Sequence, residues 1–283
     1  MARALTRETD KETGTMTFDA VRGVQAGKEF YSTMVSFKTI AEHFKFDDPS
    51  IAVDQRAQRR IRESRIPQLS NYIIQNPDNY VFSSITVSVG GKMTFHPTPG
   101  LGDLGRTGTL IISMDAPLLI NDGQHRCAAI KEVYSKNKDF QNEKISVVFF
   151  LDVGLKRSQQ MFADLNKHAV KPTKSLGLLY DHRDTYARFI VNLAKDVEVF
   201  NGRTEMERAS IAARSKNFFT LNGIADATRY LLKLNTKSIP AEKQKLAIEF
   251  WETVSQNMPD WQLLLDKSTK VTPTELRENY VHA

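Results

Sequence analysis

The sequence contains a single cysteine, Cys127, among its 283 residues. One cysteine excludes an internal disulfide framework and any metal site built from several cysteines. No apolar run approaches the roughly 20 residues that a membrane-spanning helix needs. The polar first residues are not followed by an apolar core, so the start of the chain lacks the pattern of a signal peptide. These absences predict a cytoplasmic protein that makes no use of a membrane.

The composition is that of an ordinary globular protein, with 41% hydrophobic and 25% charged residues. A chain of this length can bury a sizeable core as one large domain or as two smaller ones. The formal net charge is +6 at pH 7, which modestly favours a polyanionic partner.

The most informative stretch is residues 118–130, LLINDGQHRCAAI. An apolar run stops at Asp122 and Gly123, and a helical pattern with small residues follows. We expect the Asp122 side chain to cap this helix and Gly123 to allow a sharp turn. The first helical turn, where free N–H groups attract anions, would then hold Gln124, His125 and Arg126. The pattern is typical of a phosphate or nucleotide site, although a capped helix with structural hydrogen bonds would look the same.

The order of elements predicts a mobile tail over 1–15, a mixed α/β domain over 16–155 and a helical domain over 156–283. Expected strands are 30–37, 80–89, 92–95, 110–112, 118–120 and 145–153, with a hairpin turn at Gly90-Gly91. Expected helices are 37–46, 54–76, 123–134, 156–168, 173–199, 205–215, 220–234, 240–257 and 272–281. The last helix begins with a capping box, Thr272 to Glu275, and lacks a stop signal. We therefore expect the natural chain to continue beyond Ala283.

A second unusual stretch spans residues 159–175. Met161 and Leu165 are spaced to anchor a helix to the core. Polar residues follow near the end of this helix, namely Asp164, Asn166 and His168. Lys171 and Lys174 flank a Pro-Thr pair, where they either form a second anion site or remain ordinary exposed lysines.

The DGQHR residues 122–126, together with residues 162–174 (FADLNKHAVKPTK), resemble the DndB family, the DGQHR proteins of DNA phosphorothioation gene clusters. The resemblance extends from about Phe30 to the end of the chain. It implies an α/β (α+β) fold with a ParB/sulfiredoxin-like mixed-sheet core and added helices. It also implies a regulator that binds double-stranded DNA at the promoter of its own operon, as a possible homo-oligomer, and restrains modification.

The wider ParB-like superfamily implies a nucleoside triphosphate, with Mg²⁺, as a possible ligand. The residues that would bind it by similarity are Gly123, Gln124, His125, Arg126, Asn166, Lys171 and Lys174. The ParB motif has a glutamate that this chain lacks, which argues against metal-assisted hydrolysis. In sulfiredoxin the catalytic cysteine stands where this chain has Gln124, and Cys127 comes three residues later. Thiol and sulfur-transfer chemistry are therefore not expected, and Cys127 is expected to be a small buried hydrophobe.

Two further hypotheses remain open beside the regulator. One is a nucleotide-hydrolysing switch of the ParB type; the other is a DNA nickase or nuclease. Candidate catalytic residues for these are Asp122, His125, Arg126 and Asp164, with no metal site predicted. Five arginines are the candidate DNA contacts, unless they form a solvated helix face with pairs such as Arg59–Glu63: Arg56, Arg59, Arg60, Arg62 and Arg65.

Overall fold

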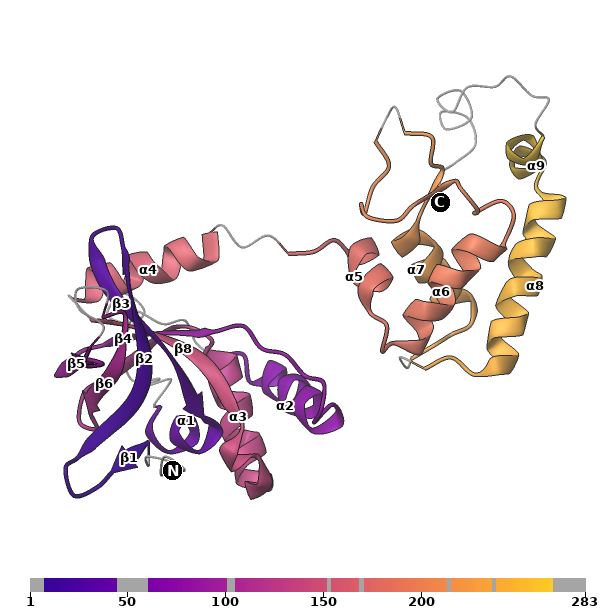
Figure 1. The fold of residues 1–283 in the computed structure, drawn as a ribbon. Coiled ribbons are helices and arrows are strands. Elements are labelled where there is room, and N and C mark those ends of the chain that lie inside the picture. The colour runs from indigo at the N-terminus through magenta and orange to yellow at the C-terminus, as the bar shows by residue number, and fades with distance from the viewer. Residues whose placement is uncertain are drawn as a thin grey trace. The chain divides into compact units, whose positions relative to one another are not determined.

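The computed structural model describes residues 8–44, 61–100, 105–151, 154–167, 171–212, 215–235 and 238–266. It divides into two compact units, Met1–Ala169 and Val170–Ala283, which are drawn in Figure 1. The first unit is built around a sheet and the second consists mainly of helices. The predicted α+β fold is confirmed. The predicted domain boundary at 155–156 differs from this division, which assigns the helix after the sheet to the first unit.

The first unit contains an eight-stranded mixed sheet in the order β5-β6-β2-β3-β8-β4-β7, with β1 beside β2. All neighbours are antiparallel except β4 and β8. The strands are β1 (Thr9–Asp10), β2 (Thr15–Gln25), β3 (Lys28–Ser36), β4 (Ile85–Val89), β5 (Met93–Pro97), β6 (Thr107–Ser113), β7 (Leu118–Asp122) and β8 (Lys144–Leu151).

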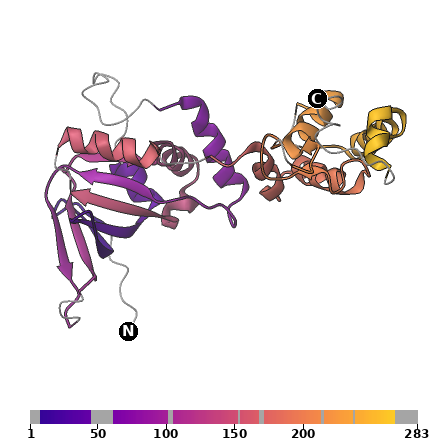
Figure 2. The same ribbon diagram turned by 90° about the horizontal axis from the view of Figure 1, so that it is seen from above.

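Helices lie on both faces of this sheet. Alternate strand residues such as Val35, Val87 and Phe149 are fully buried and form one core with the helices on the first face. The helices on this face are α1 (Phe37–His43), α2 (Ile66–Gln75) and α3 (Gln124–Lys136). The other face is covered in part by α4 (Leu155–Lys167), which contacts β7 and runs along the strands in Figure 2.

The second unit has a separate aromatic core. Phe200, Phe219 and Trp261 meet edge to face, and Trp251 stacks on Trp261 at a centroid distance of 6.0 Å. The helices around this core are α5 (Lys174–Tyr180), α6 (Thr185–Asp196), α7 (Leu221–Leu231), α8 (Ala241–Asn257) and α9 (Pro259–Leu265). Two short parallel strands, β9 (Thr204–Glu205) and β10 (Phe219–Thr220), complete the unit.

Two predicted features of the sheet unit are wrong. Gly90-Gly91 does not close a hairpin, because β4 pairs with β7 and β8 whereas β5 pairs with β6. The predicted strand over 80–89 begins only at Ile85. Long-range pairing partners decide both outcomes, and local alternation cannot identify those partners.

The predicted helix over 54–76 begins, within the described residues, with η2 (Glu63–Arg65) followed by α2 at Ile66. Pro67 favours this start because its ring fits the first turn of a helix. Residues 54–60 lie outside the described residues, as does the predicted helix over 272–281.

Two predicted helices of the second unit are also wrong. The helix over 173–199 is interrupted between α5 and α6, where Asp184 accepts hydrogen bonds from the backbone N–H groups of Tyr186 and Ala187 and so starts a new helix. The described part of 205–215 is not helical. Its first residue belongs to β9, and the Glu205 carboxylate accepts from the N–H groups of Glu207 and Arg208.

The described end of the predicted tail over 1–15 is packed onto the sheet. β1 pairs with β2, and the Glu8 carboxylate accepts hydrogen bonds from Ser36 and Thr39 while it pairs with Lys144 at 3.2 Å. Burial alone would raise the pKa of Glu8, but these hydrogen bonds and the lysine outweigh it and lower the pKa.

Candidate functional site

The DGQHR turn, residues 122–126, joins β7 to α3 through a glycine in a left-handed conformation. Gly123 has φ 102° and forms the N-cap of α3. A Cβ atom at this position would lie 3.0 Å from Ile85 Cγ1 and 3.1 Å from Arg126 Nη2. Glycine is therefore required both for the backbone angle and for the space that the arginine occupies. The sharp turn predicted at Gly123 is confirmed.

A β-bulge precedes this turn. Thr86 pairs with Asp122 and Val87 with Ile120, so Asn121 is the extra residue on β7. Its fully buried side chain donates to Ser88 Oγ at 2.6 Å and to Met161 Sδ of α4 at 3.2 Å. Among the described residues its Oδ1 atom has no hydrogen-bond partner.

Asp122 does not cap α3, so that prediction is wrong. Its Oδ2 accepts a 2.6 Å charge-assisted hydrogen bond from Arg126 Nη2, one helical turn later. The same guanidinium donates to Ser83 Oγ. The Arg126 side chain is only 15% exposed. Arg126 therefore links the start of α3 to β7 and to the segment before β4. None of the described side chains caps that helix.

Gln124 and His125 also form hydrogen bonds with backbone groups of this unit. Gln124 is buried, and its Nε2 donates to the Ile120 carbonyl at 3.4 Å. His125 Nε2 accepts from the Arg62 backbone N–H at 3.0 Å. An accepting Nε2 requires a neutral ring with its proton on Nδ1. The DGQHR turn is therefore connected directly to the arginine-containing segment that leads into α2.

Cys127 follows the turn on α3 and is fully buried among the core side chains. Desolvation raises the pKa of its thiol to about 12. The expected role as a small buried hydrophobe is confirmed.

The remaining predicted site residues lie in several places. Arg62 and Arg65 are exposed, and neither forms an ion pair with a described residue. Asp164 lies on α4 and accepts from Gln160 Nε2 at 2.7 Å. Arg56, Arg59, Arg60 and His168 lie outside the described residues, as does the side chain of Asn166.

Lys171 and Lys174 belong to the second unit and are exposed. Lys174 lies 3.9 Å from Asp226, and the Thr173 side chain caps α5 by accepting from the Leu176 N–H. The joint binding of one anion by these lysines and the DGQHR turn stays a prediction. The described residues contain no group of three or more His, Cys, Asp or Glu side chains placed to hold a metal ion.

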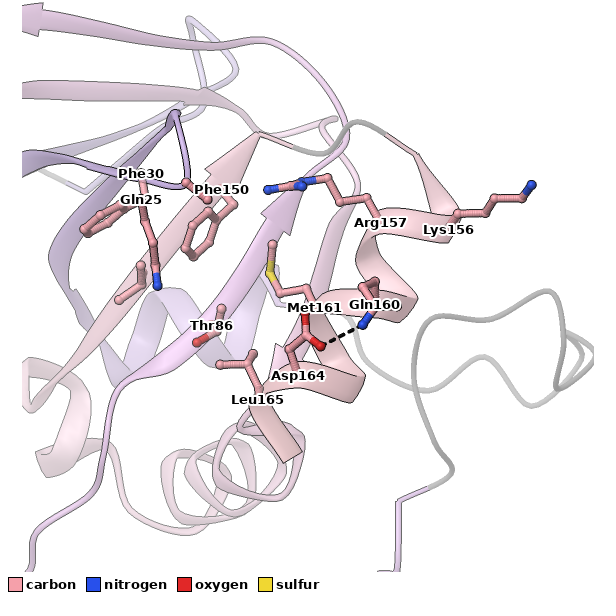
Figure 3. A pocket seen from close by; sticks show the side chains of 12 residues that line it. Gln25, Phe30, Thr86, Phe150, Lys156, Arg157, Gln160, Met161, Asp164 and Leu165 are labelled. Atoms are coloured by element: carbon pink, nitrogen blue, oxygen red, sulfur yellow. Dashed lines mark hydrogen bonds between the residues drawn. The ribbon is translucent and has the colours of Figure 1, made fainter. Parts of the chain in front are cut away.

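The sequence reasoning missed a pocket beside α4. Its volume is about 860 Å³, and its lining residues come from the β2–β3 hairpin, β4, β8 and α4 (Figure 3): Gln25, Ala26, Phe30, Thr86, Val148, Phe150, Lys156, Arg157, Gln160, Met161, Asp164 and Leu165. Thr86 is also the cross-strand neighbour of Asp122, so the pocket begins one strand away from the DGQHR turn. The only sequence signal was the Lys-Arg pair directly after the last strand of the sheet.

The fold and this turn define a class: an α+β protein with a DGQHR junction between a sheet strand and a buried helix. A family model described as "DndB: DNA-sulfur modification-associated" matches residues 18–283. The chain therefore belongs to the DndB family, and the predicted family is confirmed. No curated protein and no solved structure matches the chain. Within its described part, no helix is both long and apolar enough to span a membrane.

Proposed function

We propose that this chain is a DNA-binding transcriptional regulator that binds the promoter region of its own DNA phosphorothioate modification operon and restrains modification. The observation that carries this proposal is the membership of the DndB family over residues 18–283, because that family is associated with DNA-sulfur modification. The net charge of +6 supports a nucleic-acid partner.

Of the five arginines expected to contact DNA phosphates, the structure describes Arg62 and Arg65. Both are exposed; Arg62 precedes the single helical turn η2 at the entrance to α2, and Arg65 ends it. The bond from the Arg62 N–H to His125 holds this entrance against α3. Two cations on an anchored backbone would lose less freedom on binding than two cations on a free loop.

The test is a gel-shift titration with the upstream fragment of the operon and a shuffled duplex of equal length. We expect the upstream fragment to bind more tightly, and the Arg62→Gln/Arg65→Gln variant to weaken binding to both duplexes. The plot of log K against log[salt] has a negative slope, and each lost phosphate contact reduces its magnitude by about 0.9. The double variant should therefore reduce the magnitude of the slope by up to about 1.8.

The control variant is Lys92→Gln/Arg106→Gln, which removes two exposed charges at β5 and β6. It should leave the salt slope within experimental error of the parent protein. Equal affinity for the shuffled duplex would exclude selective repression. An unchanged slope in the Arg62 and Arg65 variant would exclude those residues as contacts.

A second candidate is a nucleotide-dependent switch with phosphates at the DGQHR turn. Its support is the start of α3, which no side chain caps and where a helix attracts anions. Against it, the Arg126 guanidinium is already engaged by Asp122 and Ser83, and Gln124 is turned inward. A triphosphate at this turn would have to compete with these hydrogen bonds. Calorimetry with ATP, CTP and GTP in the presence of Mg²⁺ tests the proposal, and Arg126→Ala should abolish any binding that occurs at this turn.

A further inference from the structure

The pocket beside α4 combines an aromatic floor with a cation. Phe30 of β3 and Phe150 of β8 are cross-strand partners, and their rings stack with centroids 5.6 Å apart at an interplanar angle of 30°. Both rings are only partly buried, unlike Phe18 and Phe149 in the core of the same sheet. Together they form an aromatic part of the pocket lining.

Gly23 supports this surface from the neighbouring strand. It pairs with Phe30, and a Cβ atom at position 23 would lie 2.4 Å from the Phe30 ring. The ring therefore lies directly over the glycine backbone, a packing that restricts its movement. An aromatic surface that is held in place before binding loses little entropy when a ligand stacks on it.

Arg157 supplies the positive charge. It lies in the first turn of α4, and Figure 3 shows its guanidinium extending toward the Phe150 ring, while Lys156 points away from the pocket. Neither cation forms an ion pair with any residue that the structure describes. An exposed, unneutralised guanidinium beside an aromatic surface is suited to bind a phosphate.

Hydrogen-bonding groups line the pocket from both α4 and the sheet. Gln160 and Asp164 are bonded to each other at 2.7 Å, and Thr86 adds a hydroxyl group. Together they offer an amide, a carboxylate and a hydroxyl within the same cavity. A volume of about 860 Å³ lies within the range of small-molecule sites, about 300–1,000 Å³.

We propose that this pocket binds a nucleotide, with the base stacked on Phe30 and Phe150 and the phosphate at Arg157. The aromatic rings fit a base, the cation fits a phosphate, and the hydrogen-bonding groups fit the edge of the base. The nucleotide is either a free mononucleotide or one unpaired nucleotide of a DNA strand. The site is distinct from the DGQHR turn and from the arginines proposed to contact duplex DNA, so it does not depend on either of those proposals.

The experiment measures binding of the full chain to a fluorescein-labelled ten-nucleotide single strand of mixed sequence, by anisotropy. AMP, CMP, GMP and TMP are then added as competitors, and their direct binding is measured by calorimetry. Binding of mononucleotides at micromolar to low millimolar concentration identifies a free nucleotide as the ligand. Binding of the strand without competition by mononucleotides identifies an unpaired nucleotide of DNA.

Three variants test the site. Phe150→Leu should weaken binding about fivefold or more, since it removes one stacking face. Arg157→Gln should weaken binding and reduce its salt dependence. Gly23→Ala, which displaces the Phe30 ring, should also weaken binding, whereas the Lys92→Gln/Arg106→Gln control should not.

The proposal is overturned if neither mononucleotides nor the single strand bind the parent protein. It is also overturned if binding occurs but Phe150→Leu and Arg157→Gln leave it unchanged. Gel shifts with the upstream duplex are run on the same variants. Normal duplex binding by Phe150→Leu shows that the variant is folded and separates failure of this pocket from failure of the proposed regulator function.

Discussion

Replacing Gly123 by alanine tests the physical account of the DGQHR turn. An L-residue in a left-handed conformation costs about 1–2 kcal/mol, and φ 102° lies beyond the centre of that region. The new methyl group would also approach Ile85 Cγ1 at 3.0 Å. Since Ile85 is fully buried on a central strand, relief requires an off-rotamer side chain at about 0.5–1.5 kcal/mol. The expected loss in the free energy of unfolding is about 1.5–3.5 kcal/mol.

The assay is urea unfolding followed by two signals. Both tryptophans, Trp251 and Trp261, lie in the second unit, so their fluorescence reports that unit alone. Far-UV circular dichroism also includes the sheet of the first unit. We expect Gly123→Ala to lower the urea midpoint of the first unit's dichroism transition by about 0.8–1.8 M, taking a slope of about 2 kcal/mol per M. The fluorescence transition should stay where it is.

Gly14→Ala is the matched control. Gly14 also has a positive φ of 62°, but a Cβ atom there would meet nothing within 4 Å. Gly14→Ala should therefore show the cost of the left-handed conformation without the cost of steric crowding, and a smaller shift in the urea midpoint. Equal shifts in the two variants would refute the packing argument at Ile85 and Arg126. A shift of the fluorescence transition by Gly123→Ala would refute independent unfolding of the two units.

Three further predictions follow from single buried groups. Glu8→Gln should destabilise the protein by about 1–3 kcal/mol at neutral pH, as measured by urea titration. Folding lowers the pKa of Glu8, so this difference in stability is present above pH 4.5. It should disappear as the pH falls through the folded-state pKa. Cys127, buried and with a pKa of about 12, should react with a thiol reagent at pH 8 only after denaturation, and rapid modification of the native protein would contradict its burial. Tyr186→Phe removes the hydrogen bond that the Tyr186 hydroxyl donates to the Ala225 carbonyl. It should lower the free energy of unfolding seen by tryptophan fluorescence by about 0.5–1.5 kcal/mol, with the dichroism of the first unit as internal reference.

The turn at Gly123 and the helix behind it could be predicted because their signals are local. The end of an apolar strand, a glycine and a helical pattern are adjacent in sequence, and a few backbone angles decide the result. The signal for the break between α5 and α6 is also local, because an Asp side chain such as that of Asp184 prefers to cap a helix rather than to lie inside it. The prediction nevertheless gave more weight to the helical pattern around Asp184 and so missed the break.

The contacts within the candidate site could not be predicted. Arg126 meets Ser83, and His125 meets the Arg62 backbone, only because β4 pairs with β7 and α2 packs against α3. The pocket depends in the same way on the pairing of β3 with β8, which brings Phe30 and Phe150 together. Such pairings depend on side-chain packing across the whole sheet, and a single sequence does not reveal them.

By itself, the sequence determined the family, the α+β class and the position of the DGQHR turn, since composition, motif and backbone preference act over short distances along the chain. Only the tertiary structure decided what the turn does with its polar groups: Asp122 and Arg126 bind each other instead of standing open to a ligand. It alone also revealed the pocket beside α4. The physical reason is that a side chain's partners depend on which strands and helices become neighbours, and long-range packing determines those neighbours.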